Sequence, residues 1–122
     1  MLGHRLGATV IMSVGYNDFS DQYAANMEAA LAELSSAGVK HVLWATLHFS
    51  PAHLGYQTMN DAIAAAATHH PELAIVDWNA YASGHPEWFQ SDQVHLTSDG
   101  PRALARLFHS SLVKLGIPAR RP

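Results

Sequence analysis

Three short apolar runs, separated by segments with helical periodicity, constrain the fold of this chain more than any other feature. The runs lie at residues 8–14, 39–47 and 73–78, and all are rich in Val, Ile and Leu. Because they lack a strict alternation of apolar and polar residues, they are typical of strands buried on both faces of a parallel sheet.

Apolar side chains recur every three or four residues outside these runs, which predicts amphipathic helices. The helical segments are 20–37, 57–70 and 97–115. Asn17 or Ser20 could cap the first helix and Thr97 the last, whereas Gly38 and Gly116 would end them. The β-α-β-α-β-loop-α order predicts an α/β fold with right-handed crossovers, in which a short parallel sheet lies between two layers of helices.

The length of the chain predicts a single domain over residues 1–122. Three strands are few for a sheet of this kind, and the first predicted strand begins close to Met1. We therefore expect that the chain is the C-terminal part of a larger unit whose N-terminal strands are missing, or that its open sheet edge pairs with a second copy in a homodimer.

Composition argues against several classes of partner. The net charge is −3 with neutral histidine, and the seven basic residues are scattered, so we expect no nucleic-acid partner. The absence of cysteine excludes disulfides and thiolate metal sites. No apolar run approaches the roughly 20 residues of a membrane span, and the first residues do not resemble a signal peptide. We expect no membrane partner and a cytoplasmic location for the chain as written, although a longer parent could be exported.

Histidine is abundant, with nine residues, but none follows the tight spacing of a zinc-binding motif. His69 and His70 lie at the end of a predicted helix, where a cationic ring interacts favourably with the helix dipole. We therefore predict no metal site and no cofactor.

The three tryptophans fall into two groups. Trp44 lies within the second apolar run and is predicted to be a core residue. Trp78 and Trp88 lie beside predicted loops, where they could line a sugar-binding cleft or join the core.

A polar tetrapeptide, Gly15-Tyr16-Asn17-Asp18, directly follows the first predicted strand. In open α/β sheets, ligands bind outside the carboxyl ends of the strands. Gly15 permits a sharp turn, and the side-chain amide of Asn17 is a suitable donor to a developing oxyanion. The alternative is an ordinary turn in which Asn17 or Asp18 caps the next helix.

A second polar segment, Asp92-Gln93-Val94-His95, precedes the last predicted helix. If this segment turns, the Asp92 carboxylate can accept a hydrogen bond from Nδ1–H of His95 and leave Nε2 available as a general base. The alternative is a solvated loop in which the pair is incidental.

Together, the two polar segments resemble the SGNH/GDSL hydrolase family. The Gly-Tyr-Asn-Asp segment resembles the third conserved block of that family, and Asp-x-x-His-Leu-Thr with its following glycine, at 92–100, resembles the fifth. Asp77-Trp78 and the 85–89 segment are similar to the subgroup of O-acyltransferase-associated SGNH domains. The resemblance covers about residues 8–115 and implies a flavodoxin-like α/β domain that hydrolyses or transfers ester-linked acyl groups.

This resemblance also implies roles for individual residues. His95 would be the general base and later the general acid, and Asp92 would orient its ring. Asn17 would donate a hydrogen bond to the oxyanion, Gly15 would let the backbone approach, and Asp18 would brace the loop. The implied partner is a small-molecule or carbohydrate acyl ester.

The chain departs from the family in one respect, because it lacks the Gly-Asp-Ser block that carries the nucleophilic serine. Ser13 is expected to be buried in the first strand, and of the other serines only Ser50 follows a predicted strand. We therefore interpret the chain as a partial SGNH-type hydrolase or acyltransferase domain without its nucleophile block. One alternative is a non-catalytic remnant that acts as a binding or assembly module, and another is a reading frame whose true start lies upstream.

Overall fold

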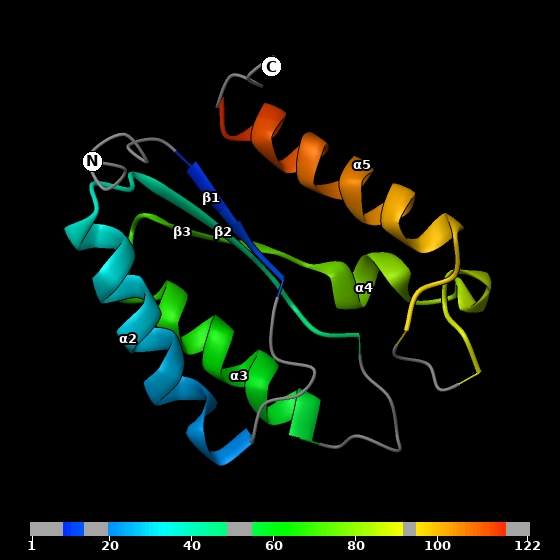
Figure 1. The fold of residues 1–122 in the computed structure, drawn as a ribbon, viewed down its shortest axis with the longest axis horizontal. Helices are drawn as coiled ribbons and strands as arrows, with labels where there is room; N and C mark the ends of the chain where they lie inside the picture. Colours follow the sequence, from blue (N-terminus) through cyan, green and yellow to red (C-terminus); the bar gives the residue numbers. More distant parts are fainter. Residues whose placement is uncertain (1–8, 14–19, 49–54, 92–94, 117–122) are drawn as a thin grey trace.

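The sheet is short, parallel and three-stranded in the part of the chain that the structure describes. The computed structural model describes residues 9–13, 20–48, 55–91 and 95–116. The strands are β1 (Thr9–Met12), β2 (His41–Ala45) and β3 (Leu73–Val76). They are ordered β1-β2-β3, so β2 is the central strand (Figure 1). The predicted α/β class and parallel sheet are confirmed.

Helices cover both faces of this sheet. They are α2 (Tyr23–Ser36), which follows the 3-10 turn η1 (Ser20–Gln22), then α3 (Gly55–Ala67), α4 (Trp78–Ala82), the 3-10 turn η2 (Pro86–Trp88), and α5 (Asp99–Lys114). Helices α2 and α3 lie on one face, and α4 and α5 pack on the other (Figure 1). No helix within the described ranges combines the length and apolar character needed to cross a bilayer.

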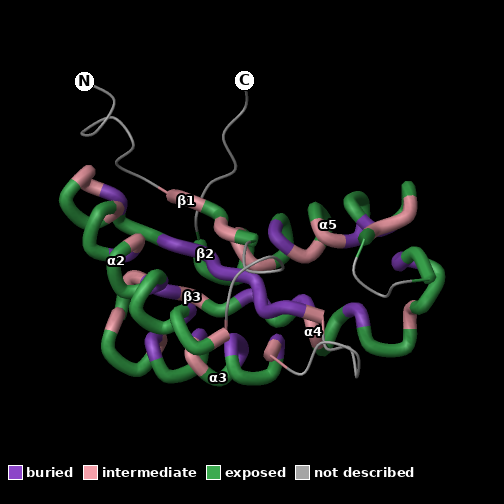
Figure 2. The backbone as a smooth tube through the Cα atoms, turned by 60° about the horizontal axis from the view of Figure 1, so that its bottom comes forward, coloured by how far each residue is buried: buried purple, intermediate pink, exposed green. Residues whose placement is uncertain are grey.

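The central strand β2 is buried on both faces, as the sequence predicts (Figure 2). Val42 and Trp44 join the core beneath α2 and α3, whereas Leu43 and Ala45 join the core beneath α4 and α5. Alternate side chains of a strand point to opposite faces of the sheet. One strand therefore contributes to both cores, and the prediction that Trp44 is a core residue is confirmed.

A buried hydrogen bond connects α2 to β2. Nε1–H of Trp44 donates to the hydroxyl oxygen of Tyr23 over 2.9 Å, and the two rings meet edge to face with centroids 6.4 Å apart. Both side chains are almost fully buried, so this bond satisfies an indole N–H that water does not reach.

The edge strand β1 is less buried than predicted. Ile11 remains 45% exposed, and Ser13, which directly follows the strand, is exposed rather than buried. An edge strand has a hydrogen-bonded neighbour on one side only, whereas continuous apolar runs are typical of strands inside a sheet. The sequence pattern therefore overestimated the burial of this run.

The helix ends agree only in part with the predicted caps. Gly38 follows α2 with a φ of +87°, a left-handed conformation that ends helices and favours glycine. The N-cap of α2 is Gln22, without a side-chain cap, and the N-cap of α5 is Ser98 rather than Thr97. Helix α4 and the turn η2 lie in a stretch that the sequence suggested was a loop.

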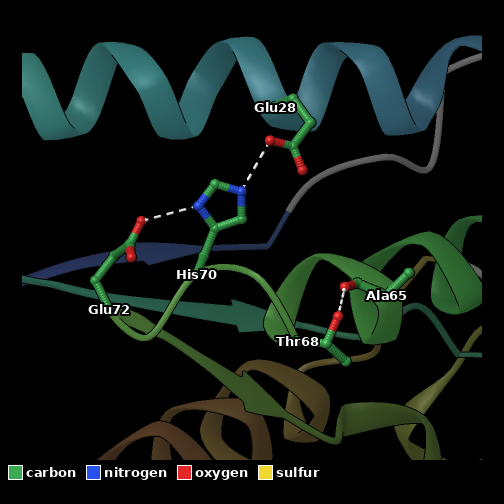
Figure 3. Close-up of polar contacts among 5 residues, drawn as sticks. All are labelled: Glu28, Ala65, Thr68, His70 and Glu72. Carbon is green, nitrogen blue, oxygen red and sulfur yellow. Dashed lines mark hydrogen bonds and ion pairs between the residues drawn. The ribbon is translucent and has the colours of Figure 1, made fainter.

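His70 lies in the turn between α3 and β3 and contacts two carboxylates (Figure 3). Its Nε2 is 2.8 Å from Oε1 of Glu28 on α2, and its Nδ1 is 3.3 Å from Oε2 of Glu72. The hydrogen bond to Glu28 and the negative charges of both glutamates raise the pKa of His70. The sequence suggested only an interaction of His70 with the helix dipole. The two carboxylate contacts additionally join α2 to the turn before β3.

We predict that His70→Ala lowers the free energy of unfolding more at about pH 6 than at about pH 9. A histidine whose folded-state pKa is raised contributes its full stabilisation below the unfolded pKa of about 6.5 and loses it as the pH rises through the folded value. The difference should stay below about 1 kcal/mol, because the groups are partly exposed. Urea unfolding of this variant and of a His69→Ala control measures it, and an equal loss at both pH values would contradict the prediction.

Candidate functional site

The backbone that leaves β2 is fixed by Asn60, a buried residue of α3. The backbone N–H of Leu47 donates to Oδ1 of Asn60 over 2.7 Å, and Nδ2–H of Asn60 donates back to the Leu47 carbonyl over 2.8 Å. Both residues are buried. The paired hydrogen bonds set the direction of the chain just before His48.

A second set of hydrogen bonds joins the carboxyl ends of β2 and β3. The Thr46 hydroxyl donates to Oδ1 of Asp77 over 3.0 Å and accepts from the backbone N–H of Asn79 over 2.9 Å. The same Asp77 oxygen accepts from the N–H of Ala80 over 3.1 Å and so caps α4. Asp77, noted in the sequence for its resemblance to a family segment, therefore has a structural role at this edge.

His95 lies between η2 and α5, in a segment that pairs with the residues directly after η2. Phe89 and Leu96 form an isolated antiparallel bridge, and the N–H of Gln90 donates to the carbonyl of His95 over 2.8 Å. Thr97 fixes the base of the loop, because its hydroxyl donates to the Glu87 carbonyl over 2.7 Å. Thr97 thus contacts the start of the loop instead of capping α5.

The glycine of the same sequence block permits a close approach at the start of α5. A Cβ atom at Gly100 would lie 2.7 Å from the Trp88 carbonyl oxygen and 2.7 Å from Cβ of Leu96. Only glycine, which has no side chain, fits this close to both Trp88 and Leu96.

The loop that carries His95 lies beside the carboxyl end of the central strand. The ring of Phe89 stacks on that of His48, three residues beyond Ala45, with centroids 4.0 Å apart. His95 is therefore carried on a segment that packs against the sheet edge where α/β proteins bind ligands.

The other residues of the predicted site lie outside the described residues. They are Gly15, Asn17, Asp18 and Asp92, together with Ser50. The pairing of Asp92 with His95 and their approach to Asn17 stay predictions, and His95 itself is exposed.

Trp78 and Trp88 join the second core and do not line an open cleft. Trp78 is 1% exposed and Trp88 9%, and their rings stack with centroids 5.7 Å apart. His85 covers the outer indole, with its ring 3.9 Å from that of Trp88, and its Nδ1 is 2.9 Å from Oε2 of Glu87. Of the two interpretations open for these tryptophans, the structure supports the core.

Two hollows, which we term the His85 hollow and the Asn79 hollow, share His48 as a lining residue. The His85 hollow has a volume of about 340 Å³, and its lining includes His85, Phe89 and Gln90. The Asn79 hollow, of about 410 Å³, is lined by Gln57, Asn79, Ala80 and Ser83 as well as His48. Burial lowers the pKa of His48, so its ring is neutral at neutral pH.

Neither His48 nor His85 was assigned a role from the sequence. His48 could have been found by its position, since it directly follows an apolar run that ends at the carboxyl edge of the sheet. Within the described ranges, no three histidine or carboxylate side chains gather as a metal centre requires.

Comparison with known proteins relates part of this chain to named acetyltransferases. No protein-family model matches it. A segment of 61 residues, 49% of this chain, is 38% identical to the peptidoglycan O-acetyltransferase OatA of Listeria monocytogenes. A segment of 49 residues, 40% of the chain, is 37% identical to the "Putative peptidoglycan O-acetyltransferase YrhL" of Bacillus subtilis. These matches cover 10% and 8% of the two relatives.

We predict that Asn60→Ala destabilises the protein by about 2–4 kcal/mol, because two buried backbone groups of Leu47 lose their partners. Urea unfolding followed by circular dichroism gives the value. Asp61→Ala is the matched control, since its hydrogen bond to Gln57 is exposed and its loss should cost within about 0.5 kcal/mol. A similar loss for both variants would show that the contact with Leu47 is not the cause.

We also predict that Gly100→Ala costs about 1–3 kcal/mol, because the added methyl group must displace backbone at Trp88. Gly84→Asn serves as the control: Gly84 has a φ of +85°, which asparagine tolerates, and no atom lies within 4 Å of its Cβ position. Thermal unfolding compares the two. A Gly100→Ala protein as stable as the wild type would contradict the close packing of the loop against α5.

Proposed function

We propose that this chain is part of an SGNH-type acyl-ester hydrolase or O-acyltransferase domain that acts on carbohydrate acyl esters. The observation that carries the proposal is the stacking of Phe89 on His48, which holds the His95 loop against the carboxyl end of β2. The order of the two sequence blocks and the similarity of part of the chain to named peptidoglycan O-acetyltransferases support it.

In the proposed reaction a serine hydroxyl attacks the carbonyl carbon of the ester. Nε2 of His95 accepts the serine proton and later returns a proton to the departing alkoxide, while the Asp92 carboxylate stabilises the cationic ring. The Asn17 amide donates a hydrogen bond to the oxyanion, and Gly15 lets the backbone approach it. Water or a sugar hydroxyl then releases the acyl group, which gives hydrolysis or transfer.

We assign the base and one oxyanion donor to this chain, and not the nucleophile. The Gly-Asp-Ser block does not occur in the sequence. Of the other serines weighed as substitutes, Ser13 is exposed beside β1, and Ser50 lies outside the described residues. The alternative function, a binding or assembly module of the same fold without catalysis, predicts no special reactivity for His95.

The test is hydrolysis of 4-nitrophenyl acetate by the 122-residue chain. Because the chain lacks the nucleophile block, we expect only slow turnover, in which Nε2 of His95 accepts a proton from an attacking water molecule. His95→Ala and Asp92→Asn should each reduce this rate by about tenfold or more, because a positioned general base contributes roughly 10²–10⁴-fold in complete sites. His109→Ala, which removes an exposed histidine of α5, is the control and should leave the rate unchanged.

Two outcomes would contradict the assignment. Equal rates for the wild type, His95→Ala and His109→Ala would favour the non-catalytic module. Stoichiometric labelling of one serine by a serine-directed phosphonate, located by mass spectrometry, would show that the chain contains its own nucleophile.

A further inference from the structure

The outward face of α5 combines positive charge with an exposed apolar side chain. Four exposed residues are spaced by four, three and four positions and so lie along one face of the helix: Arg102, Arg106, His109 and Val113. The other side of α5 packs into the second core. Val113 is 64% exposed, more than any other large apolar side chain in the described part of the chain. We term these four residues the outward face of α5.

The two arginines of this face have no carboxylate partner among the described residues. The ion pairs there involve only His70 and His85 as the cationic groups. Asp99, in the first turn, is the one acidic side chain of α5. The guanidinium groups of Arg102 and Arg106 are therefore available to anions outside the molecule, and guanidinium pairs well with phosphate.

Positive and negative charges are separated across the sheet. The lysine and arginine residues are widely spaced in the sequence, yet five of the seven lie within 102–121, a stretch without aspartate or glutamate. Helices α2 and α3 carry Glu28, Glu33 and Asp61, all exposed, and have no lysine or arginine. These helices cover the opposite face of the sheet from α5 (Figure 1). An anionic surface that meets α5 thus faces the basic side of the molecule, although the net charge is −3.

The exposed valine distinguishes between the possible anionic partners. A nucleic acid presents a hydrated phosphate backbone, which offers little to an apolar side chain. A lipid surface offers phosphates and, directly beneath them, an apolar phase, and helices that lie on such a surface pair basic with apolar side chains. Val113 beside Arg102 and Arg106 therefore favours lipid.

We propose that the outward face of α5 binds the surface of an anionic lipid bilayer. Arg102 and Arg106 contact lipid phosphates, and Val113 enters the headgroup layer. The expectation of no membrane partner was based on the length that a spanning segment needs, and a helix that lies on the surface does not need that length. The proposal is independent of the proposed function, because it uses none of the residues assigned to acyl transfer.

The experiment is flotation of the 122-residue chain with lipid vesicles. One set is phosphatidylcholine alone, and the other contains about 30% phosphatidylglycerol, which gives a negative surface potential. We expect weak binding to the anionic vesicles only, measurable at about 50 mM salt. Most of it should be lost at about 300 mM salt, because ions screen the attraction between the arginines and the lipid phosphates.

Two variants with the same change in charge test the position of the contact. Arg106→Gln should weaken binding to anionic vesicles about fivefold, because one cation near such a surface contributes about that factor. Lys40→Gln is the matched control: Lys40 is also exposed but directly precedes β2, so its loss should change binding by less than about twofold. Circular dichroism checks that both variants fold.

A third variant tests the apolar part of the contact. Val113→Ser leaves the charge unchanged and should weaken binding about threefold, because the isopropyl group no longer enters the lipid. Its binding should keep the salt dependence of the wild type, whereas that of Arg106→Gln should become less steep.

Four results would overturn the proposal. They are no flotation with the anionic vesicles at about 50 mM salt, equal binding to phosphatidylcholine alone, and equal losses in Arg106→Gln and Lys40→Gln. The fourth is tighter binding to a DNA duplex at the same concentration of phosphate, which would assign the outward face of α5 to nucleic acid instead of lipid.

Discussion

Burial of β2 on both faces is the constraint on which the other features of the structure depend. Its odd and even side chains contribute to different cores, so a change in its register would disturb both layers of helices at once. Complete burial of a single large apolar side chain contributes roughly 1.5–3 kcal/mol, and Val42, Leu43 and Trp44 are each at most 2% exposed. The position of the chain where it leaves the sheet is consequently well determined.

Because the backbone that leaves β2 has a fixed position, polar groups can be held in place at the carboxyl edge of the sheet. Asn60 binds the backbone of Leu47, and Thr46 binds Asp77, so the ends of β2 and β3 are tied to α3 and α4 by buried or partly buried hydrogen bonds. The two bonds between Asn60 and Leu47 are the costly ones to break, because these buried groups would have no access to water. His48 directly follows Leu47, and its ring stacks on Phe89. This contact fixes the segment that carries His95 relative to the end of β2.

Sequence reasoning succeeded where a pattern depends on local periodicity. The three strands, three longer helices and the glycine that ends α2 follow from apolar spacing and from backbone freedom at Gly38. It failed where contacts between residues distant in the sequence determine which local structure forms. Helix α4 has only five residues, too few for a periodic signal, and forms because Asp77 caps it and Trp78 packs against Trp88. Thr97 has the right chemistry for an N-cap but binds the Glu87 carbonyl instead.

In the candidate site, too, a residue in a local motif could be proposed from the sequence, whereas residues brought together by tertiary packing could not. A local motif, an aspartate three residues earlier in the sequence, made His95 a candidate, and its role stays a prediction. His48 and His85 are separated by 37 positions, and only the packing of the loop after η2 against the end of β2 makes them lining residues of one hollow. The partial burial of His48 at this place also lowers its pKa and so favours the neutral ring. The same packing therefore sets both which residues line the hollow and the pKa of one of them.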